Sequence, residues 1–239
     1  MLGDSLAPFD LTANRIRQPP DTFMDKRRQT PHITGMSNQE TEKKRVLIAV
    51  TGASGADYGQ RLLEMLRDAP DVESHLVISK SGRLTISAEL GRDAAEVEAL
   101  ADVVHLSGNV GAAPASGSFR LDAMIVAPCS VKTASNIAYG NTSDLITRAA
   151  DVQLKERRTL VLAVRETPLH AGHLETLTKL AHLGAVIFPP VPAFYQKPEA
   201  VRDIVDQTCM RLLDQAGVRV EAAPRWGEAG GIKAIGGEG

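Results

Sequence analysis

Short apolar runs alternate with stretches of helical length from residue 45 to residue 216, and this alternation restricts the fold more than any other feature of the chain. The apolar runs predict strands at 45–50, 73–78, 102–106, 122–127, 159–164 and 185–188. The other stretches predict helices at 55–68, 81–90, 93–100, 131–139, 144–156, 171–183 and 198–216. Strands alternating with helices form right-handed crossovers, so we expect a mainly parallel, doubly wound α/β sheet with helices on both faces.

Both ends of the chain lack this pattern. Residues 1–44 contain Pro8, Pro19, Pro20 and Pro31 among scattered charges, which predicts a disordered leader. Residues 218–239 are rich in glycine and predict a flexible tail. One domain is expected between them, at 45–217.

Composition excludes several classes of partner. With 239 residues, 43 % hydrophobic content and a net charge of −2, the chain has no overall electrostatic reason to bind nucleic acid or acidic lipid. No apolar segment approaches the roughly 20 residues of a membrane helix. Cys129 and Cys209 have no CxxC spacing, so we expect plain thiols in a reducing cytoplasm.

The turn after the first predicted strand, Thr51-Gly52-Ala53-Ser54-Gly55, opens a helix. Its backbone N–H groups and the Ser54 hydroxyl lie where a helix dipole favours phosphate. Because the spacing is not GxGxxG, a mononucleotide such as FMN is favoured over NAD. A tight turn with Ser54 as an ordinary N-cap is the alternative. Ser79, which ends the second strand, offers a similar hydroxyl.

Pro128-Cys129-Ser130-Val131-Lys132-Thr133 repeats this arrangement after the central strand. Two hydroxyls at a helix N-terminus suit a ribityl chain or a phosphate, and Lys132 adds charge. An ordinary capped helix is again the alternative.

Charged residues follow the fifth predicted strand and lie on the helix before it. Arg165 can bind an oxyanion bidentately, and Glu166 can act as an acid or base if desolvation raises its pKa. A structural ion pair is the competing interpretation. Arg148 and Lys155 are seven positions apart and share one helix face, for which a solvated surface is the default interpretation.

The stiff loop 189–195, Pro-Pro-Val-Pro-Ala-Phe-Tyr, presents two aromatic residues, with Arg211 farther along the chain. His170 and His173 have HxxH spacing without a third ligand, so no metal site is predicted.

Taken together, these motifs resemble the UbiX family of flavin prenyltransferases over residues 45–217. The matching stretches are Thr51–Gly55, Ala115–Phe119, Ala127–Thr133, Arg148–Arg157, Val164–His170 and Pro189–Tyr195. The resemblance implies a Rossmann-like flavoprotein that joins a dimethylallyl group from dimethylallyl monophosphate to reduced FMN at N5 and C6, without a metal. The product is the prenylated cofactor of UbiD-type decarboxylases.

The resemblance also implies roles for individual residues. FMN would be held by Gly52, Ala53, Ser54, Ser79, Ser130, Val131, Lys132, Thr133 and Arg165. The prenyl phosphate would be held by Arg148, Lys155, Tyr195 and Arg211. Proton transfer would involve Ser54, Glu89 and Glu166, with Glu89 assigned only by its spacing from Ser79.

Family members form high-order homo-oligomers, such as dodecamers, in which a neighbouring subunit completes the site, so Arg148 and Lys155 are expected to act across an interface. The chain departs from the family at Val131, where methionine is frequent, and at Asp144, which is expected to add negative charge near Arg148.

Two other functions stay open. One is an accessory protein that only carries FMN to a decarboxylase, and the other is an FMN-dependent cysteine-type decarboxylase, although no PxMNxxMW-like loop is present.

Overall fold

The computed structural model describes residues 43–223, 225 and 227, which belong to one compact unit. The predicted leader therefore lies outside the described residues, apart from its last two positions. In the described part, a six-stranded sheet has the order β3-β2-β1-β4-β5-β6, and every neighbouring pair is parallel. The strands are β1 (Lys44–Val50), β2 (Val72–Ile78), β3 (Val103–Leu106), β4 (Ala123–Cys129), β5 (Thr159–Val164) and β6 (Val186–Ile187).

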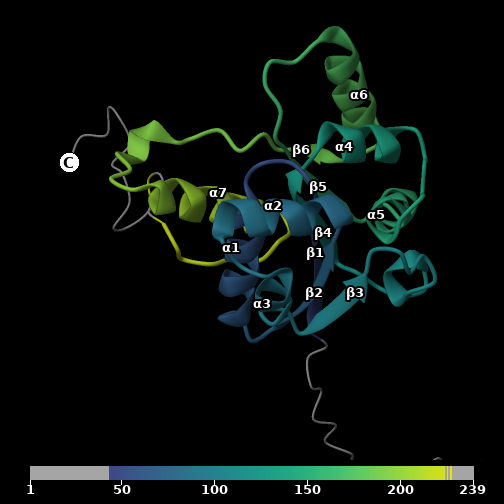
Figure 1. Cartoon of the computed structure of the whole chain (residues 1–239), viewed down its shortest axis with the longest axis horizontal. Coiled ribbons are helices and arrows are strands. Elements are labelled where there is room, and N and C mark those ends of the chain that lie inside the picture. Colours follow the sequence, from purple (N-terminus) through teal and green to yellow (C-terminus); the bar gives the residue numbers. More distant parts are fainter. Residues whose placement is uncertain (1–42, 224, 226, 228–239) are drawn as a thin grey trace, which may run out of the picture. The chain divides into compact units, whose positions relative to one another are not determined.

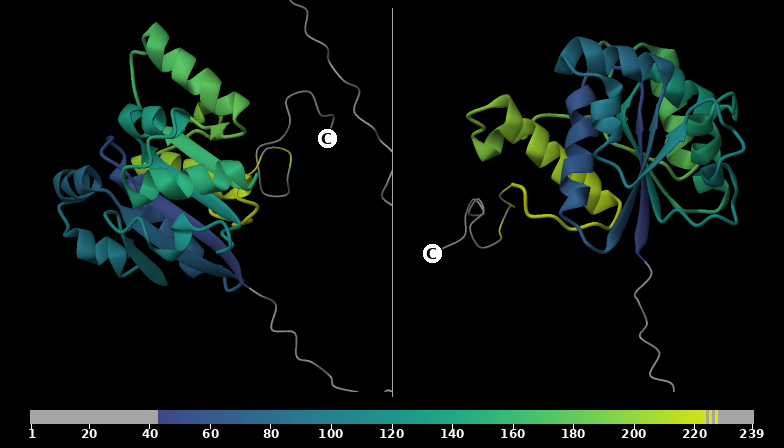
Figure 2. Two further views of the ribbon diagram at one scale, coloured as in Figure 1. Left: turned by 90° about the vertical axis from the view of Figure 1, so that its right-hand side faces the viewer. Right: turned by 60° about the horizontal axis from the view of Figure 1, so that its bottom comes forward.

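Helices cover both faces of this sheet, as Figure 2 shows with the sheet between two helical layers. One layer contains α1 (Ala56–Arg67), α2 (Lys80–Leu90), α3 (Ala94–Glu98) and α7 (Val201–Gln215). The other contains α4 (Val131–Ala138), α5 (Leu145–Lys155) and α6 (Ala171–His182). Two short 3₁₀ helices, η1 (Ala113–Ala115) and η2 (Phe194–Gln196), lie in the connections. The doubly wound α/β prediction is confirmed.

The core follows from the alternation of side chains along each strand. In β1, Val46, Ile48 and Val50 pack against the α1 and α7 layer, while Leu47 and Ala49 pack against the α4 and α5 layer. All five are fully buried. A strand that is buried on both faces reads as a continuous apolar run, which is why the sequence predicts these strands well.

Most element bounds differ from the prediction by one or two residues, and three differences have a clear structural description. Pro128 and Cys129, expected in the turn, belong to β4, where the pairing with β5 shifts register between Val126 and Cys129. The last helix begins at Val201 rather than 198, because the Asp203 carboxylate accepts hydrogen bonds from the N–H groups of Glu199 and Ala200 and fixes its start there. β6 contains only two residues.

The chain beyond α7 continues as packed structure. Val218 is 6 % exposed, and Val220 and Ala222 pack against the same core cluster as α7. The first residues of the predicted flexible tail are therefore packed, because their apolar side chains contact the hydrophobic core. No helix in the described ranges has the length and hydropathy that would be needed to span a membrane.

Strand order reverses between β1 and β4, with β2 and β3 on one side and β5 and β6 on the other (Figure 1). In a sheet of this kind the crevice at the carboxyl ends of the two central strands is the usual ligand site. Thr51, Ser130 and Arg165 each follow directly after one of the three adjacent strands β1, β4 and β5.

Candidate functional site

The turns after β1 and β4 are joined by the side chain of Thr51. Its Oγ1 donates a hydrogen bond to Pro128 O at 2.7 Å and accepts one from Ser130 N at 2.9 Å. Thr51 is 1 % exposed, so both bonds are shielded from water. The two predicted flavin turns therefore lie side by side and are held in a fixed relation, as their positions at strand ends predict.

The neighbouring turns extend this edge on both sides. Ser79 N donates to Val50 O at 2.9 Å, and Arg165 N donates to Cys129 O at 3.0 Å. A Cβ atom on Gly52 would lie 2.4 Å from Ser81 Cβ, so the turn after β1 and the start of α2 are in close contact. Ser79, Gly52, Ser130 and Arg165 thus follow four neighbouring strands in the order β2, β1, β4 and β5.

Glu89, from α2, occupies the N-terminus of α1. Its Oε2 accepts hydrogen bonds from Gly55 N at 2.8 Å and from Ala56 N at 2.9 Å. The phosphate expected at this helix end is thus replaced by a carboxylate of the protein itself. The prediction that these N–H groups are open to a ligand is wrong for Gly55 and Ala56.

The same contacts keep Glu89 ionised. Burial alone would raise the pKa of Glu89, but hydrogen bonds from the Ser54 side chain and from the N–H groups of Ala56 and Gly55, together with the charge of Arg165, lower it overall. Ser54, Glu89 and Arg165, assigned from separate parts of the sequence, are therefore close enough to interact. Glu89 is positioned to accept a proton from the Ser54 hydroxyl.

The hydroxyl groups at the other turns cap helices and still have hydrogens to donate. Ser79 Oγ accepts from Gly82 N at 2.9 Å, and Ser130 Oγ accepts from Thr133 N at 3.2 Å. Ser130 Oγ and Thr133 Oγ1 lie 3.0 Å apart and share one hydrogen. Each hydroxyl carries a single hydrogen, so this pair retains one, and Ser79 retains its own. The capping interpretation and the ligand interpretation are compatible.

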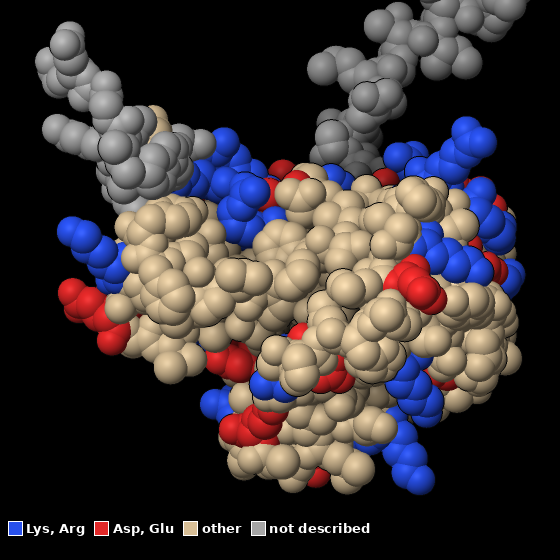
Figure 3. All heavy atoms as spheres, turned by 90° about the horizontal axis from the view of Figure 1, so that it is seen from above, with Lys and Arg blue, Asp and Glu red and all other residues tan. Residues whose placement is uncertain are grey.

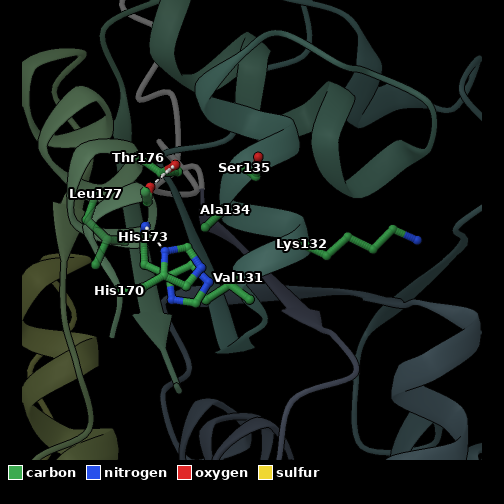
Figure 4. A pocket seen from close by; sticks show the side chains of 9 residues that line it. Val131, Lys132, Ala134, Ser135, His170, His173, Thr176 and Leu177 are labelled. Carbon is green, nitrogen blue, oxygen red and sulfur yellow. Dashed lines mark hydrogen bonds between the residues drawn. The ribbon is translucent and has the colours of Figure 1, made fainter. Parts of the chain in front are cut away.

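A pocket of about 370 Å³ lies between α4 and α6, and its lining includes Lys132, His170 and His173. The rings of His170 and His173 stack with their centroids 3.6 Å apart, and Lys132 extends away from them (Figure 4). His170 Nδ1 accepts from His173 N at 3.4 Å and so caps α6. Val131 lines the same pocket and connects it to the turn after β4.

Arg148 and Lys155 both face the loop that contains η1, which agrees with the shared helix face. Arg148 Nε donates to Ala115 O at 3.1 Å, and its Nη1 pairs with Asp151 at 2.7 Å. A Cβ atom on Gly117 would lie 2.7 Å from Lys155 Nζ. Lys155 also pairs with Glu156.

Asp144 lies one helical turn before Arg148 and forms its side-chain hydrogen bonds with Thr147. Its carboxylate accepts hydrogen bonds from the N–H and the Oγ1 of Thr147, both at 2.8 Å, and thereby caps α5. The extra negative charge is used at the helix N-terminus, where the dipole favours it.

Tyr195 and Arg211 lie elsewhere in the chain. Tyr195 belongs to η2 and is half exposed, whereas Arg211 lies on α7 and pairs with Asp214 at 3.1 Å. Because α5 and α7 cover opposite faces of the sheet, one copy of the chain does not bring the four predicted phosphate-binding residues together.

Glu166 and Arg165 are both exposed. Glu166 Oε1 accepts from Thr167 N at 3.0 Å, and no ion pair between Glu166 and Arg165 is formed in the described structure. The desolvation that the sequence-based hypothesis requires for Glu166 is not provided by this copy alone.

Comparisons with known proteins agree with this geometry. A family model described as Flavoprotein matches residues 34–213. The flavin prenyltransferase UbiX of Escherichia coli K12 is 51 % identical over 185 residues, which cover 77 % of this chain and 98 % of that protein. The chain belongs to the UbiX family of flavin prenyltransferases.

Solved structures of UbiX proteins have the same fold. AnUbiX (PadA1), solved in complex with FMN and dimethylallyl pyrophosphate, is 48 % identical with a TM-score of 0.76, covering 77 % of this chain and 97 % of that one. A dodecameric FMN-dependent UbiX-like decarboxylase from Escherichia coli O157:H7 is 48 % identical with a TM-score of 0.72, covering 73 % and 96 %.

The donors at this candidate site fit FMN. The hydroxyls of Ser79, Ser130 and Thr133 and the guanidinium of Arg165 are the groups that a ribityl phosphate requires. Burial raises the pKa of Cys129 to about 12, so its thiol, although next to Ser130, is not a nucleophile.

Two residues that contact the candidate site were not predicted from the sequence. Thr51 joins the two turns, and its position directly after a buried strand is the sequence signal for such a role. Tyr58 was not singled out. Its ring lies beside Gly55, where a Cβ atom would be 2.8 Å from Cδ2, and it interacts electrostatically with Arg165.

Proposed function

We propose that this chain transfers the dimethylallyl group of dimethylallyl monophosphate to N5 and C6 of reduced FMN and releases phosphate. Membership of the UbiX family supports the reaction class. The observation that carries the proposal is the grouping of Ser54, Glu89 and Arg165 beside the flavin turns at the carboxyl edge of the sheet.

For the cofactor, we propose Gly52, Ala53, Ser54, Ser79, Ser130, Val131, Lys132, Thr133 and Arg165 as the binding residues. When bound, reduced FMN supplies the electron-rich N5 and C6 positions that accept the prenyl group. The link from Thr51 to Ser130 supports this set, because it holds two of the turns in a fixed relation before any ligand arrives. A site that is ordered in advance loses less entropy on binding.

For the prenyl phosphate, we propose Arg148, Lys155, Tyr195 and Arg211, gathered from more than one copy of the chain. The positions of α5 and α7 on opposite faces of the sheet favour a site completed by a neighbouring copy. Cationic donors stabilise the phosphate as the allylic C–O bond breaks, so no metal is required in this scheme. An apolar enclosure keeps water from the developing carbocation.

A homo-oligomer also explains the exposed apolar residues of α6 and the segment before α7. Leu174 is 52 % exposed, Val191 71 % and Phe194 73 %. The side of the molecule seen from above has broad uncharged areas between groups of charged side chains (Figure 3). The dodecameric relative supports an assembly of this kind.

For proton transfer, we propose that Ser54 and Glu89 act as a connected pair and that Glu166 acts as a second acid or base. The side-chain hydrogen bond between Ser54 and Glu89 supports this pairing, because it places an ionised carboxylate next to the hydroxyl. Glu166 would become desolvated once a neighbouring copy covers it.

We further propose that the product is delivered to a UbiD-type decarboxylase in the cytoplasm.

The deciding experiment for the prenyl transfer is anaerobic incubation of the purified protein with reduced FMN and dimethylallyl monophosphate, with and without EDTA. Mass spectrometry should find a flavin heavier by one C5H8 unit in both samples. An unchanged mass with FMN bound would favour the carrier function, and a product formed only without EDTA would overturn the metal-free scheme.

A further inference from the structure

Asp214, near the C-terminal end of α7, binds two arginines at once. Arg211 Nη1 lies 3.1 Å from Asp214 Oδ2. Arg225, from the chain after α7, binds the same carboxylate with both ends of its guanidinium, Nη1 to Oδ2 at 2.8 Å and Nη2 to Oδ1 at 2.9 Å. Arg225 therefore makes the two-pronged contact, and Arg211 makes a single one.

The two arginines differ in exposure. The Arg225 side chain is 13 % exposed and also donates to Val220 O at 3.0 Å, whereas the Arg211 side chain is 48 % exposed. Arg225 is held in place by the protein. Arg211 keeps an open side from which an anion can approach.

Two further charged side chains lie beside this pair. Glu221 faces Arg225 at 3.6 Å and pairs with Arg219 at 2.8 Å. Asp214 is also near a helix C-terminus, where the dipole disfavours negative charge and additional cations are stabilising.

We infer that Arg225 is a positioning residue for the substrate phosphate, because it takes up the Asp214 carboxylate that would otherwise neutralise Arg211. This inference rests on the proposed role of Arg211 in binding the prenyl phosphate. With Arg225 absent, Arg211 and Asp214 form a closed neutral pair, and a phosphate has to compete with the carboxylate for the guanidinium. With Arg225 bound, the charge of Arg211 is available to the phosphate.

Arg225 lies after α7 and beyond residue 213, where the match to the family model ends. In this proposal, the chain after α7 contributes through Arg225 to the affinity of the protein for its prenyl donor.

The test compares Arg225→Ala, Asp214→Asn and the double variant with the wild type, each loaded with oxidised FMN so that no turnover occurs. Calorimetry measures the Kd of dimethylallyl monophosphate, and steady-state assays with reduced FMN separate KM from kcat. Arg225→Ala should raise Kd and KM about tenfold, the scale of one charge-assisted hydrogen bond, and leave kcat and FMN affinity unchanged. The double variant should return Kd to within about twofold of the wild type, because a neutral asparagine in place of Asp214 no longer competes for Arg211.

Arg219→Ala is the matched control, since Arg219 lies in the same segment and its side chain is 64 % exposed. It should leave Kd unchanged. The inference is overturned if Arg225→Ala does not raise the Kd. It is also overturned if adding Asp214→Asn to Arg225→Ala does not restore the Kd, which is the result expected if Arg225 only anchors the segment. Absence of prenyl phosphate binding or turnover in the wild type would instead count against the proposed function.

Discussion

Glu89 Oε2 accepts a hydrogen bond from Gly55 N at 2.8 Å, so the acidic side chain of α2 caps the helix that begins after the first flavin turn. This relationship decides how the turn is used. The N–H groups of Gly55 and Ala56 bind the protein's own carboxylate, so the proposed flavin contacts in this turn fall on Gly52, Ala53 and the Ser54 hydroxyl. It also brings an ionised carboxylate to Ser54.

Glu89→Gln should slow prenyl transfer while leaving flavin binding intact. Glutamine keeps an oxygen that can accept from Gly55 N and Ala56 N, but it has no charge and cannot take a proton from Ser54. We expect kcat to fall about 100-fold, the usual scale for loss of one general base, with the Kd of FMN nearly unchanged. Stopped-flow kinetics and flavin fluorescence measure the two quantities.

The control for this variant is Glu96→Gln, which replaces another helix-capping glutamate by a residue that caps equally well. It should turn over at the wild-type rate. An undiminished rate in Glu89→Gln would remove the base role and leave Glu89 as a cap only.

Glu166→Gln should also retain FMN and slow turnover, because it removes a titrating group while keeping the size of the side chain. We expect a decrease of at least about 100-fold in kcat. The pH–rate profile should lose one limb in this variant, which a purely structural change would not cause. Wild-type turnover with both limbs present would contradict the acid or base role.

Thr51→Val should weaken both folding and cofactor binding. Valine keeps the shape but removes the oxygen that joins Pro128 O and Ser130 N at a position 1 % exposed. Leaving these buried groups without a partner should lower the free energy of unfolding by about 1–3 kcal/mol. Thr85→Val, on α2, removes a hydroxyl that bonds to Ser81 O within its own helix and should cost under about 0.5 kcal/mol. Urea titrations of the two variants and the wild type measure both changes.

The strands and most helices were predictable because burial on both faces makes each strand a continuous apolar run. The positions of Ser54, Ser130 and Arg165 at strand ends were predictable for the same reason. The contact between Glu89 and α1 was not, because it joins residues 34 positions apart through the packing of two helices. The separation of Arg148 from Arg211 was also not predictable from spacing, since it depends on which face of the sheet each helix covers.

Gly82→Ala should destabilise the protein although alanine is the better helix former. A Cβ atom at this position would lie 2.5 Å from Val50 O, and a backbone carbonyl in a central strand cannot move aside. We expect a loss of about 1–3 kcal/mol in the free energy of unfolding. Gly108→Ala is the control, because nothing lies within 4 Å of its Cβ position. Equal stabilities of the two variants would contradict the packing argument.

His75 and His105 form a pair in which the two rings cannot both be positively charged, because two N–H groups would then point at each other. His75 Nδ1 and His105 Nε2 lie 2.9 Å apart and share one hydrogen. Burial lowers the pKa of His75, with Glu73 opposing the shift, and burial together with the neighbouring His75 lowers the pKa of His105. The two carboxylates nearby, Glu73 and Asp102, have pKa values below their ordinary range, so they are ionised above about pH 5.

These lowered values predict stability that is lost in mild acid. A histidine that is less basic in the folded chain binds more protons when unfolded, so its contribution is complete above its ordinary pKa of 6.5 and declines as the pH falls below it. The free energy of unfolding should therefore fall between about pH 6.5 and pH 5. His105→Gln, which keeps a hydrogen-bond partner for His75, should make this slope shallower, whereas His182→Gln on the surface of α6 should leave it unchanged. Urea titrations across this pH range measure the slope, and identical slopes in the wild type and both variants would show that the pair does not control it.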